Sequence, residues 1–261
     1  MKVSQIAAAI EQVAPLDVQE GFDNSGLLVG DPDAEVGQAL LCVDITPEVV
    51  AEAVETGAGM IIAHHPVIFH PLKRLTGTTY IERAVPQAIK HNIALYAAHT
   101  NLDNVREGLS FRLGEMFGLT QMDFLLPSAD KPGTGTGVAG TLPQAVDVVE
   151  FLKTVKQKLG LKVVRHSTPT QATVRKVAVC SGSGASFLAA AKASGADIYL
   201  AGDFKYNDFL NADTAMIIAD IGHFESEYCA KEIIFGIIAK NFSNFVARFS
   251  KVERNPVNYL T

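Results

Sequence analysis

The chain has no tryptophan, only three cysteines and few charged residues, which make up 19% of its 261 residues. The cysteines lie far apart without a Cys-x-x-Cys spacing, which excludes a disulfide-rich secreted scaffold and a zinc ribbon built on thiolates. Long hydrophobic runs are missing as well. The longest stretch without a charged residue, 56–72, contains three histidines and two prolines and cannot be a membrane span. The apolar run 7–10 is too short for a signal peptide, so we expect a soluble cytoplasmic protein.

What is present is typical of a globular protein with a large core. Hydrophobic residues make up 48% of the chain, which excludes a disordered protein. The net charge of −6 argues against indiscriminate binding to nucleic acid or anionic membranes. One segment, 151–176, carries seven basic residues and no acidic residue. A solvated helix face followed by an edge strand is the simpler interpretation of that segment, and an anion-binding surface is the alternative.

Short runs rich in β-branched residues alternate with segments of helical periodicity, which favours an α/β fold with largely parallel strands. The predicted strands cover residues 39–45, 60–63, 93–98, 177–180, 198–201 and 215–219. The predicted helices cover residues 3–13, 47–56, 79–90, 105–117, 146–158, 187–193 and 226–239.

Two stretches, 51–65 and 189–203, look like copies of one another at a constant offset of 138 residues. Each contains a predicted helix, a Gly-Ala turn and a strand that ends in polar residues. The same offset pairs Cys42 with Cys180. We therefore predict two related α/β halves. Residues 127–140, rich in Gly, Pro, Ser and Thr, mark the expected boundary between them. The predicted first domain comprises residues 1–126 and 235–261, and the second comprises residues 127–234.

Four of the seven histidines, His64, His65, His99 and His223, stand where predicted strands end. Ligands bind at the carboxyl ends of strands in α/β sheets. Pro66 keeps His65 extended, and adjacent extended side chains point to opposite sides, so we expect the pair to serve two metals, or one metal and its surroundings.

Two carboxylates strengthen the case for a metal site. Asp103 follows His99, and Glu227 follows His223, each by four residues, a spacing that places both side chains on one face of a helix. Buried imidazoles and carboxylates from several strand ends need a cation to offset the cost of burial. Such mixed ligands suit Zn, Fe, Mn, Co or Ni and do not choose among them.

Four blocks of this sequence resemble the signature blocks of the NIF-three-like family, whose members are also named GTP cyclohydrolase 1 type 2 homologues. The blocks are Asp23–Gly30, Ala63–Phe69, Ala98–Asp103 and Gly222–Glu227, and they occur in the expected order. The chain departs from the family pattern at Val138, where a basic residue is common, and at Asn207, where histidine is common.

The resemblance implies a NIF-three-like fold of two α/β domains, with a dinuclear metal centre at strand ends between the halves. It also implies a toroidal homohexamer. Carried over by position, the ligands of two divalent metal ions are His64, His65, Asp103, His223 and Glu227. Glu227 would bridge the ions, and His99 would be a further ligand or lie behind one.

The function implied is that of a metal-dependent hydrolase, a GTP cyclohydrolase 1 type 2 homologue, which uses a metal-activated water on a small, nucleotide-like substrate. Glu225 and Asp203 are the candidates for proton transfer. The alternative is a non-catalytic metal-binding protein that regulates or contacts a protein or nucleic-acid partner, with Lys153, Lys156 and Lys158 as the basic residues of a local groove.

Overall fold

The computed structural model describes residues 1–260, and the chain divides into two compact units. The first comprises Met1–Leu102 and Ala230–Arg254, and the second comprises Asp103–Cys229 and residues 255–260. The predicted boundaries, after residues 126 and 234, differ from this division, and the predicted first domain also included the residues after Arg254. The first boundary lies earlier because α5 (Leu109–Phe117) and β5 (Thr120–Pro127) pack against strands of the second unit.

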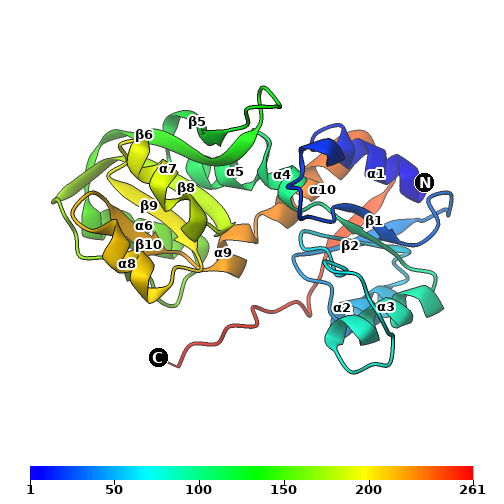
Figure 1. The fold of residues 1–261 in the computed structure, drawn as a ribbon. Coiled ribbons are helices and arrows are strands. Elements are labelled where there is room, and N and C mark those ends of the chain that lie inside the picture. The colour runs from blue at the N-terminus through cyan, green and yellow to red at the C-terminus, as the bar shows by residue number, and fades with distance from the viewer. Residues whose placement is uncertain (261) are drawn as a thin grey trace. The chain divides into compact units, whose positions relative to one another are not determined.

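The first unit is an α/β layer built on a five-stranded sheet (Figure 1). Its strand order is β1-β4-β3-β2-β11. In Figure 1, α2 and α3 cover one face of this sheet, and α1 and α10 lie on the other. The elements are α1 (Val3–Glu11), the 3-10 helix η1 (Leu16–Val18), β1 (Gly26–Val29), β2 (Gln38–Cys42), α2 (Pro47–Thr56), β3 (Met60–Ala63), α3 (Tyr80–Lys90), β4 (Ala94–Ala97), α4 (Thr100–Asp103), α10 (Ala230–Asn241) and β11 (Val246–Phe249).

Local sequence explains why α2 lies between β2 and β3. Pro47 occupies the first helical position, and the Thr46 hydroxyl accepts a hydrogen bond from the amide of Val49 (3.4 Å). Gly57 ends the helix in the left-handed conformation (φ +72°), which glycine adopts without strain. The apolar side of α2 then packs on β2 and β3, whose residues are buried on both faces of the sheet.

The second unit is also an α/β layer, with a six-stranded sheet in the order β5-β6-β8-β9-β10-β7. Helices α5 and α6 contact each other and both pack on β6 and β8. Besides α5 and β5, its elements are β6 (Gly135–Asp147), α6 (Val148–Leu159), β7 (Arg165–His166), β8 (Thr173–Ser183), the 3-10 helix η2 (Ala185–Phe187), α7 (Leu188–Ala193), β9 (Ile198–Gly202), α8 (Tyr206–Ala212), β10 (Ile217–Asp220) and α9 (His223–Glu227).

The glycine-rich segment 127–140 is not a linker between domains. Its second part belongs to β6, which pairs with β5 in an antiparallel hairpin and with β8 on the other side. A side chain at Gly135 would lie 2.5 Å from the carbonyl oxygen of Leu126, so glycine is required for the strands to approach. The composition that suggested a boundary therefore reflects close strand packing. Val138, one of the departures from the family pattern, is a fully buried core residue of β6.

The two units repeat one arrangement of strands, which confirms the two related α/β halves. Ala39 of β2 lies opposite Met60 of β3, and Val177 of β8 lies opposite Ile198 of β9. Both pairs differ by the 138-residue offset found in the sequence. In each unit a third parallel strand follows, β4 or β10, and an antiparallel strand, β1 or β7, covers its outer edge.

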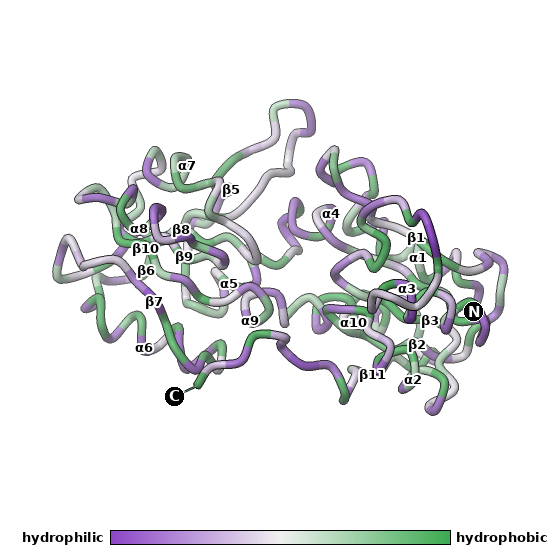
Figure 2. The backbone as a smooth tube through the Cα atoms, turned by 60° about the horizontal axis from the view of Figure 1, so that its bottom comes forward, coloured by the Kyte–Doolittle hydropathy of each residue, from purple (hydrophilic) through white to green (hydrophobic). Residues whose placement is uncertain are grey.

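The basic segment 151–176 forms most of α6, the short edge strand β7 and the start of β8. Figure 2 shows α6 alternating between hydrophobic and hydrophilic residues. The Lys153 ammonium pairs with Glu150 (2.8 Å), and the Lys158 ammonium donates to the carbonyl of Met116. The simpler interpretation of this segment, a solvated helix face and an edge strand, is the one the structure has.

The helices are short. Helices α6 and α10, for example, have 12 residues each, whereas a helix needs about 20 apolar residues to span a bilayer. Among residues 1–260, no helix has the length and apolar character that a membrane span requires.

The buried face of β3 predicts a large difference between two identical truncations. Ile61 is fully buried in the core between β3, α2 and α3, while Ile89 of α3 is 53% exposed. We expect Ile61→Ala to lower the free energy of unfolding by about 2–5 kcal/mol, because it removes buried methyl groups and leaves a cavity. Ile89→Ala should change it by less than about 1 kcal/mol. Urea denaturation of both variants checks this, and equal losses would contradict the packing described for β3.

Candidate metal centre

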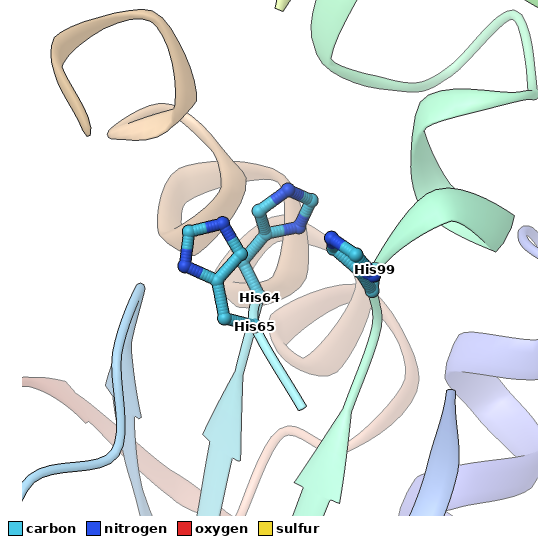
Figure 3. A group of neighbouring side chains, drawn as sticks. All are labelled: His64, His65 and His99. Atoms are coloured by element: carbon cyan, nitrogen blue, oxygen red, sulfur yellow. The ribbon is translucent and has the colours of Figure 1, made fainter. Parts of the chain in front are cut away.

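Three imidazoles gather at the carboxyl edge of the first sheet. Strands β3 and β4 are parallel, with Ala63 opposite Ala97, so they end at the same level. His64 and His65 directly follow β3, and His99 follows β4 after one further residue. Figure 3 shows the three rings clustered beyond the ends of these two strands. The carboxyl-edge position expected from the sequence is thus where the structure places them.

The three rings are close enough to share one cation. Their centroids are separated by 5.1 Å (His64–His65), 5.2 Å (His64–His99) and 5.4 Å (His65–His99). One ring nitrogen from each lies within 4.8 Å of the others. The expectation that His64 and His65 point to opposite sides is wrong, because β3 ends at Ala63 and the backbone bends at these two residues. Both side chains therefore reach the same cluster.

Each of these rings donates its Nδ1 hydrogen to a fixed acceptor. His64 donates to the carbonyl oxygen of Ala98 (2.7 Å), His65 to the carboxylate of Asp44 (2.8 Å) and His99 to the carboxylate of Asp23 (2.7 Å). Because these oxygens only accept, the Nδ1 atom must carry the proton, and Nε2 of the neutral ring has the lone pair. This arrangement, with one nitrogen anchored by an acceptor, is typical of metal-binding histidines.

Asp23 is held as a carboxylate by several donors. Besides His99, the hydroxyl of Ser25 (2.8 Å) and the amide and hydroxyl of Thr100 (3.1 and 2.5 Å) donate to it. Burial alone would raise the pKa of Asp23, but the hydrogen bonds from His99 and Thr100 outweigh it and hold the pKa well below its usual range. The carboxylate is therefore ionised at neutral pH and fixes the orientation of His99.

In the second unit, α9 brings His223 and Glu227 together, as the four-residue spacing predicted. Nε2 of His223 lies 3.1 Å from a carboxylate oxygen of Glu227, and its Nδ1 lies 2.7 Å from Asp203. Burial would lower the pKa of His223, but the two carboxylates outweigh it and raise the pKa to about 9. A cation bound at Nε2 would take the place of the proton that balances Glu227 here.

The end of β8 positions the two carboxylates of the second unit. The Ser181 hydroxyl donates to Asp103 (2.9 Å). Gly182, with a φ of +59°, lies directly against Glu227, and a Cβ at this position would be 2.0 Å from its carboxylate oxygen. The Gly182 amide donates to the hydroxyl of Ser226 (2.9 Å), which fixes the approach of α9. The structure therefore brings Asp103 and Glu227 to the same strand end.

The two candidates for proton transfer have different surroundings. Asp203 is exposed, has a φ of +61° that is uncommon outside glycine, and orients His223 through the contact at Nδ1. Glu225 is half-buried, and its carboxylate lies where a side chain at Gly222 would be, 2.2 Å from that Cβ position. The structure thus gives Asp203 an orienting contact. Asn207, the other departure from the family pattern, lies exposed on α8.

Asp23, Asp44, Ser181 and Gly182 belong to the surroundings of the site but were not among the predicted site residues. Asp44 follows the end of β2 as the histidines follow β3 and β4, so its position at a strand end was an available signal. Asp23 and His99 are 76 residues apart in the chain, and only the antiparallel pairing of β1 with β4 brings them together. The role of Gly182 depends on a contact that no local pattern indicates.

Comparison with known proteins shows relatives along the whole chain. A protein from Clostridium perfringens named GTP cyclohydrolase 1 type 2 homolog is 37% identical over 87% of this chain and 87% of its own. A protein of the same name from Campylobacter jejuni is 33% identical over 99% of this chain and 100% of its own. NIF3-like protein 1 of Drosophila melanogaster is 31% identical over 98% of this chain and 88% of its own.

Solved structures share the fold. Protein SA1388 of Staphylococcus aureus superposes with a TM-score of 0.92 at 27% identity, over 100% of this chain and 99% of that one. Reduced HcgD from Methanocaldococcus jannaschii superposes with a TM-score of 0.81 at 27% identity, over 95% of this chain and 97% of that one. A sequence profile for Duf34/NIF3 (NGG1p interacting factor 3) matches residues 1–256. The chain therefore belongs to the Duf34/NIF3 family.

Proposed function

We propose that this protein binds two divalent cations and uses them as a metal-dependent hydrolase. The proposed ligands are His64 and His65, which follow β3 in the first unit, and Asp103, His223 and Glu227 of the second unit, with His99 as a further ligand or a neighbour of one. The observation that carries the proposal is the anchoring of Nδ1 in His64, His65 and His99. A histidine that only packs in the core does not need two more anchored imidazole rings next to it.

The residues fit the cations by their chemistry. Neutral imidazoles and ionised carboxylates together bind Zn, Fe, Mn, Co or Ni, and no thiolate is part of the set. Glu227 has only 4% of its surface exposed, and a buried carboxylate needs a positive partner. Because its pKa is raised, His223 carries a second proton, and the positive charge of its ring balances Glu227. A divalent cation at the same place would balance Glu227 with a higher positive charge.

The cations, when bound, would lower the pKa of a water molecule toward neutrality and polarise the group that this water attacks. The chain's own residues have separate tasks. Asp23, Asp44 and Asp203 hold the rings of His99, His65 and His223 in one tautomer. We assign the proton transfer that follows attack to the carboxylate of Glu225, which lies two residues before Glu227 on the same short helix.

The proposed substrate is a small nucleotide-like molecule. Support comes from the names of the relatives, several of which are GTP cyclohydrolase 1 type 2 homologues. A cyclohydrolase of this kind would open the purine ring of GTP by adding water. We also propose that the protein assembles as a toroidal homohexamer, which light scattering on the purified protein tests.

Metal content is the first test of the proposal. Protein purified without an affinity tag or added metal should contain about two equivalents of a divalent metal per subunit, measured by elemental analysis. His64→Ala and Glu227→Ala should each lower this content, because each removes a ligand. His91→Ala is the matched control, since His91 is exposed at the end of α3. Metal-free wild-type protein, or equal losses in the control, would contradict the metal site.

A pair of glycine substitutions tests the position of Glu227. Gly182 and Gly195 both have positive φ, +59° and +72°, so alanine strains the backbone at each, by about 1–3 kcal/mol. Only at Gly182 does the new methyl group collide with Glu227, since nothing lies within 4 Å of the Cβ position at Gly195. Gly182→Ala should weaken metal binding by about tenfold or more, and Gly195→Ala should not. Titration calorimetry of both variants measures this, and equal affinities would show that Glu227 is not a ligand.

Activity is tested separately, in single-turnover reactions of the metal-loaded protein with GTP and a panel of nucleotide phosphodiesters. Turnover should disappear with a chelator, return when metal is added back, and fall to background in His65→Ala while His91→Ala retains it. Failure of every substrate to show metal-dependent turnover would defeat the enzyme proposal. A protein that still holds metal would then be best explained as a non-catalytic regulatory or interaction protein.

A further inference from the structure

A buried ion pair of the first unit is bonded to the backbone of Asp44, the residue that orients His65, and neither member is a proposed ligand. The side chains of Lys231, on α10, and Glu253, in the segment after β11, are only 2% and 3% exposed, and the Lys231 ammonium donates to Oε2 of Glu253. Burying two charges costs much of what their attraction returns, so such a pair is weak evidence for stability alone. Its position suggests another purpose.

The second carboxylate oxygen of Glu253 binds the backbone directly after β2. Oε1 accepts hydrogen bonds from the amide of Val43 and from the amide of Asp44 (3.2 Å). These are the first two residues after β2. The regular pairing of β2 with β3 reaches Cys42 and Ala63, and the His65 amide adds one more hydrogen bond, to the carbonyl of Val43 (2.9 Å). The backbone that carries Asp44 is thus held from one side by the sheet and from the other by Glu253.

Glu253 itself is held by the turn that follows β11. Ser250 continues the pairing with β2 through its amide, which donates to the carbonyl of Leu41 (2.9 Å). The buried carboxylate of Glu52 accepts from the Ser250 hydroxyl (2.5 Å) and from the amide of Lys251 (2.9 Å). The turn is therefore fixed before Glu253 reaches β2, and Lys231 fixes the remaining oxygen of its carboxylate.

We infer that Glu253, held by Lys231, is a positioning residue for His65. The path runs from the Glu253 carboxylate to the amides of Val43 and Asp44, and from the Asp44 carboxylate to Nδ1 of His65 (2.8 Å). The inference rests on the proposed function for its consequence, which is metal affinity. The orientation of His65 is a property of the protein without metal and can be measured separately.

Two double variants separate positioning from stability. Lys231→Met with Glu253→Gln removes both charges but keeps an amide oxygen that can accept from Val43 and Asp44. Lys231→Met with Glu253→Met removes the charges and the acceptor at similar volume. Replacing a buried ion pair by apolar residues of similar size is often neutral for stability, so both proteins should fold, which thermal unfolding verifies.

The first readout needs no metal. Nitrogen chemical shifts of the His65 ring in the metal-free protein report which nitrogen carries the proton. Wild type and the Met/Gln variant should show one dominant Nδ1–H tautomer, and the Met/Met variant should show a mixture. A mixture in wild type, or an unchanged tautomer in Met/Met, would overturn the inference, whether or not the protein binds metal.

The second readout is metal affinity by competition with a chelator. Met/Met should bind about tenfold or more weakly than wild type, Met/Gln should stay close to wild type, and the stoichiometry at saturation should not change. Asp44→Ala should weaken binding in the wild-type background and add little in Met/Met, because both act on His65. Additive losses, or equal affinities of Met/Met and Met/Gln, would mean that Glu253 has only a structural role.

Discussion

The parallel pairing of β3 with β4 is the interaction on which the candidate site of the first unit depends. Because Ala63 lies opposite Ala97, the residues that follow both strands emerge at one level of the sheet. A shift of the pairing by two residues would move His99 by roughly 6–7 Å along the strand direction relative to His64 and His65. The ring centroids lie 5.1–5.4 Å apart, so such a shift would move His99 too far from His64 and His65 to share a cation with them. The buried aliphatic residues of β3 and β4 determine that register and, through it, the chemistry.

The two units show how one strand arrangement can carry different groups. The 138-residue offset aligns His64 and His65 with Gly202 and Asp203. A side chain at Gly202 would lie 2.9 Å from the backbone nitrogen of His223, so the second unit needs glycine where the first has a ligand. Its imidazole comes instead from α9, and Asp203 orients that imidazole. The first unit thus uses residues directly after strands, and the second uses a short helix that packs on them.

Much of this could be predicted from the sequence, because it depends on short-range patterns. Apolar runs mark β3, β4, β9 and β10, and polar residues at their ends mark the edge of each sheet. The four-residue spacing of His223 and Glu227 was also enough to predict that their side chains lie together. What could not be predicted depends on contacts between distant residues. The register of β4 and β10 pairs Met60 with Ala94 and Ile198 with Ile217, so the residue of the second unit that is equivalent to His99 is Gly222.

The glycine content of residues 127–140 led to a wrong prediction of a domain boundary, and the reason is physical. The same residue serves flexible linkers and strands that approach closely, so composition alone could not tell that residues 135–140 belong to a paired strand. Gly182 raises the same difficulty at the site itself, because any side chain at this position would collide with Glu227. In both places the deciding quantity is a distance to a residue far away in the chain.

The acceptors behind the histidines follow a rule of burial. Asp44 and Asp203, whose side chains are 33% and 51% exposed, orient His65 and His223 while partly solvated. The Asp23 side chain is fully buried and is surrounded by donors from Ser25, Asn24 and Thr100 in addition to His99. His64, the most buried of the histidines, donates to a backbone carbonyl, which carries no net charge. The deeper the ring, the more an ionised acceptor would cost, because each buried carboxylate requires its own set of donors. The protein meets that cost once, at Asp23, and avoids it at His64 by using its backbone.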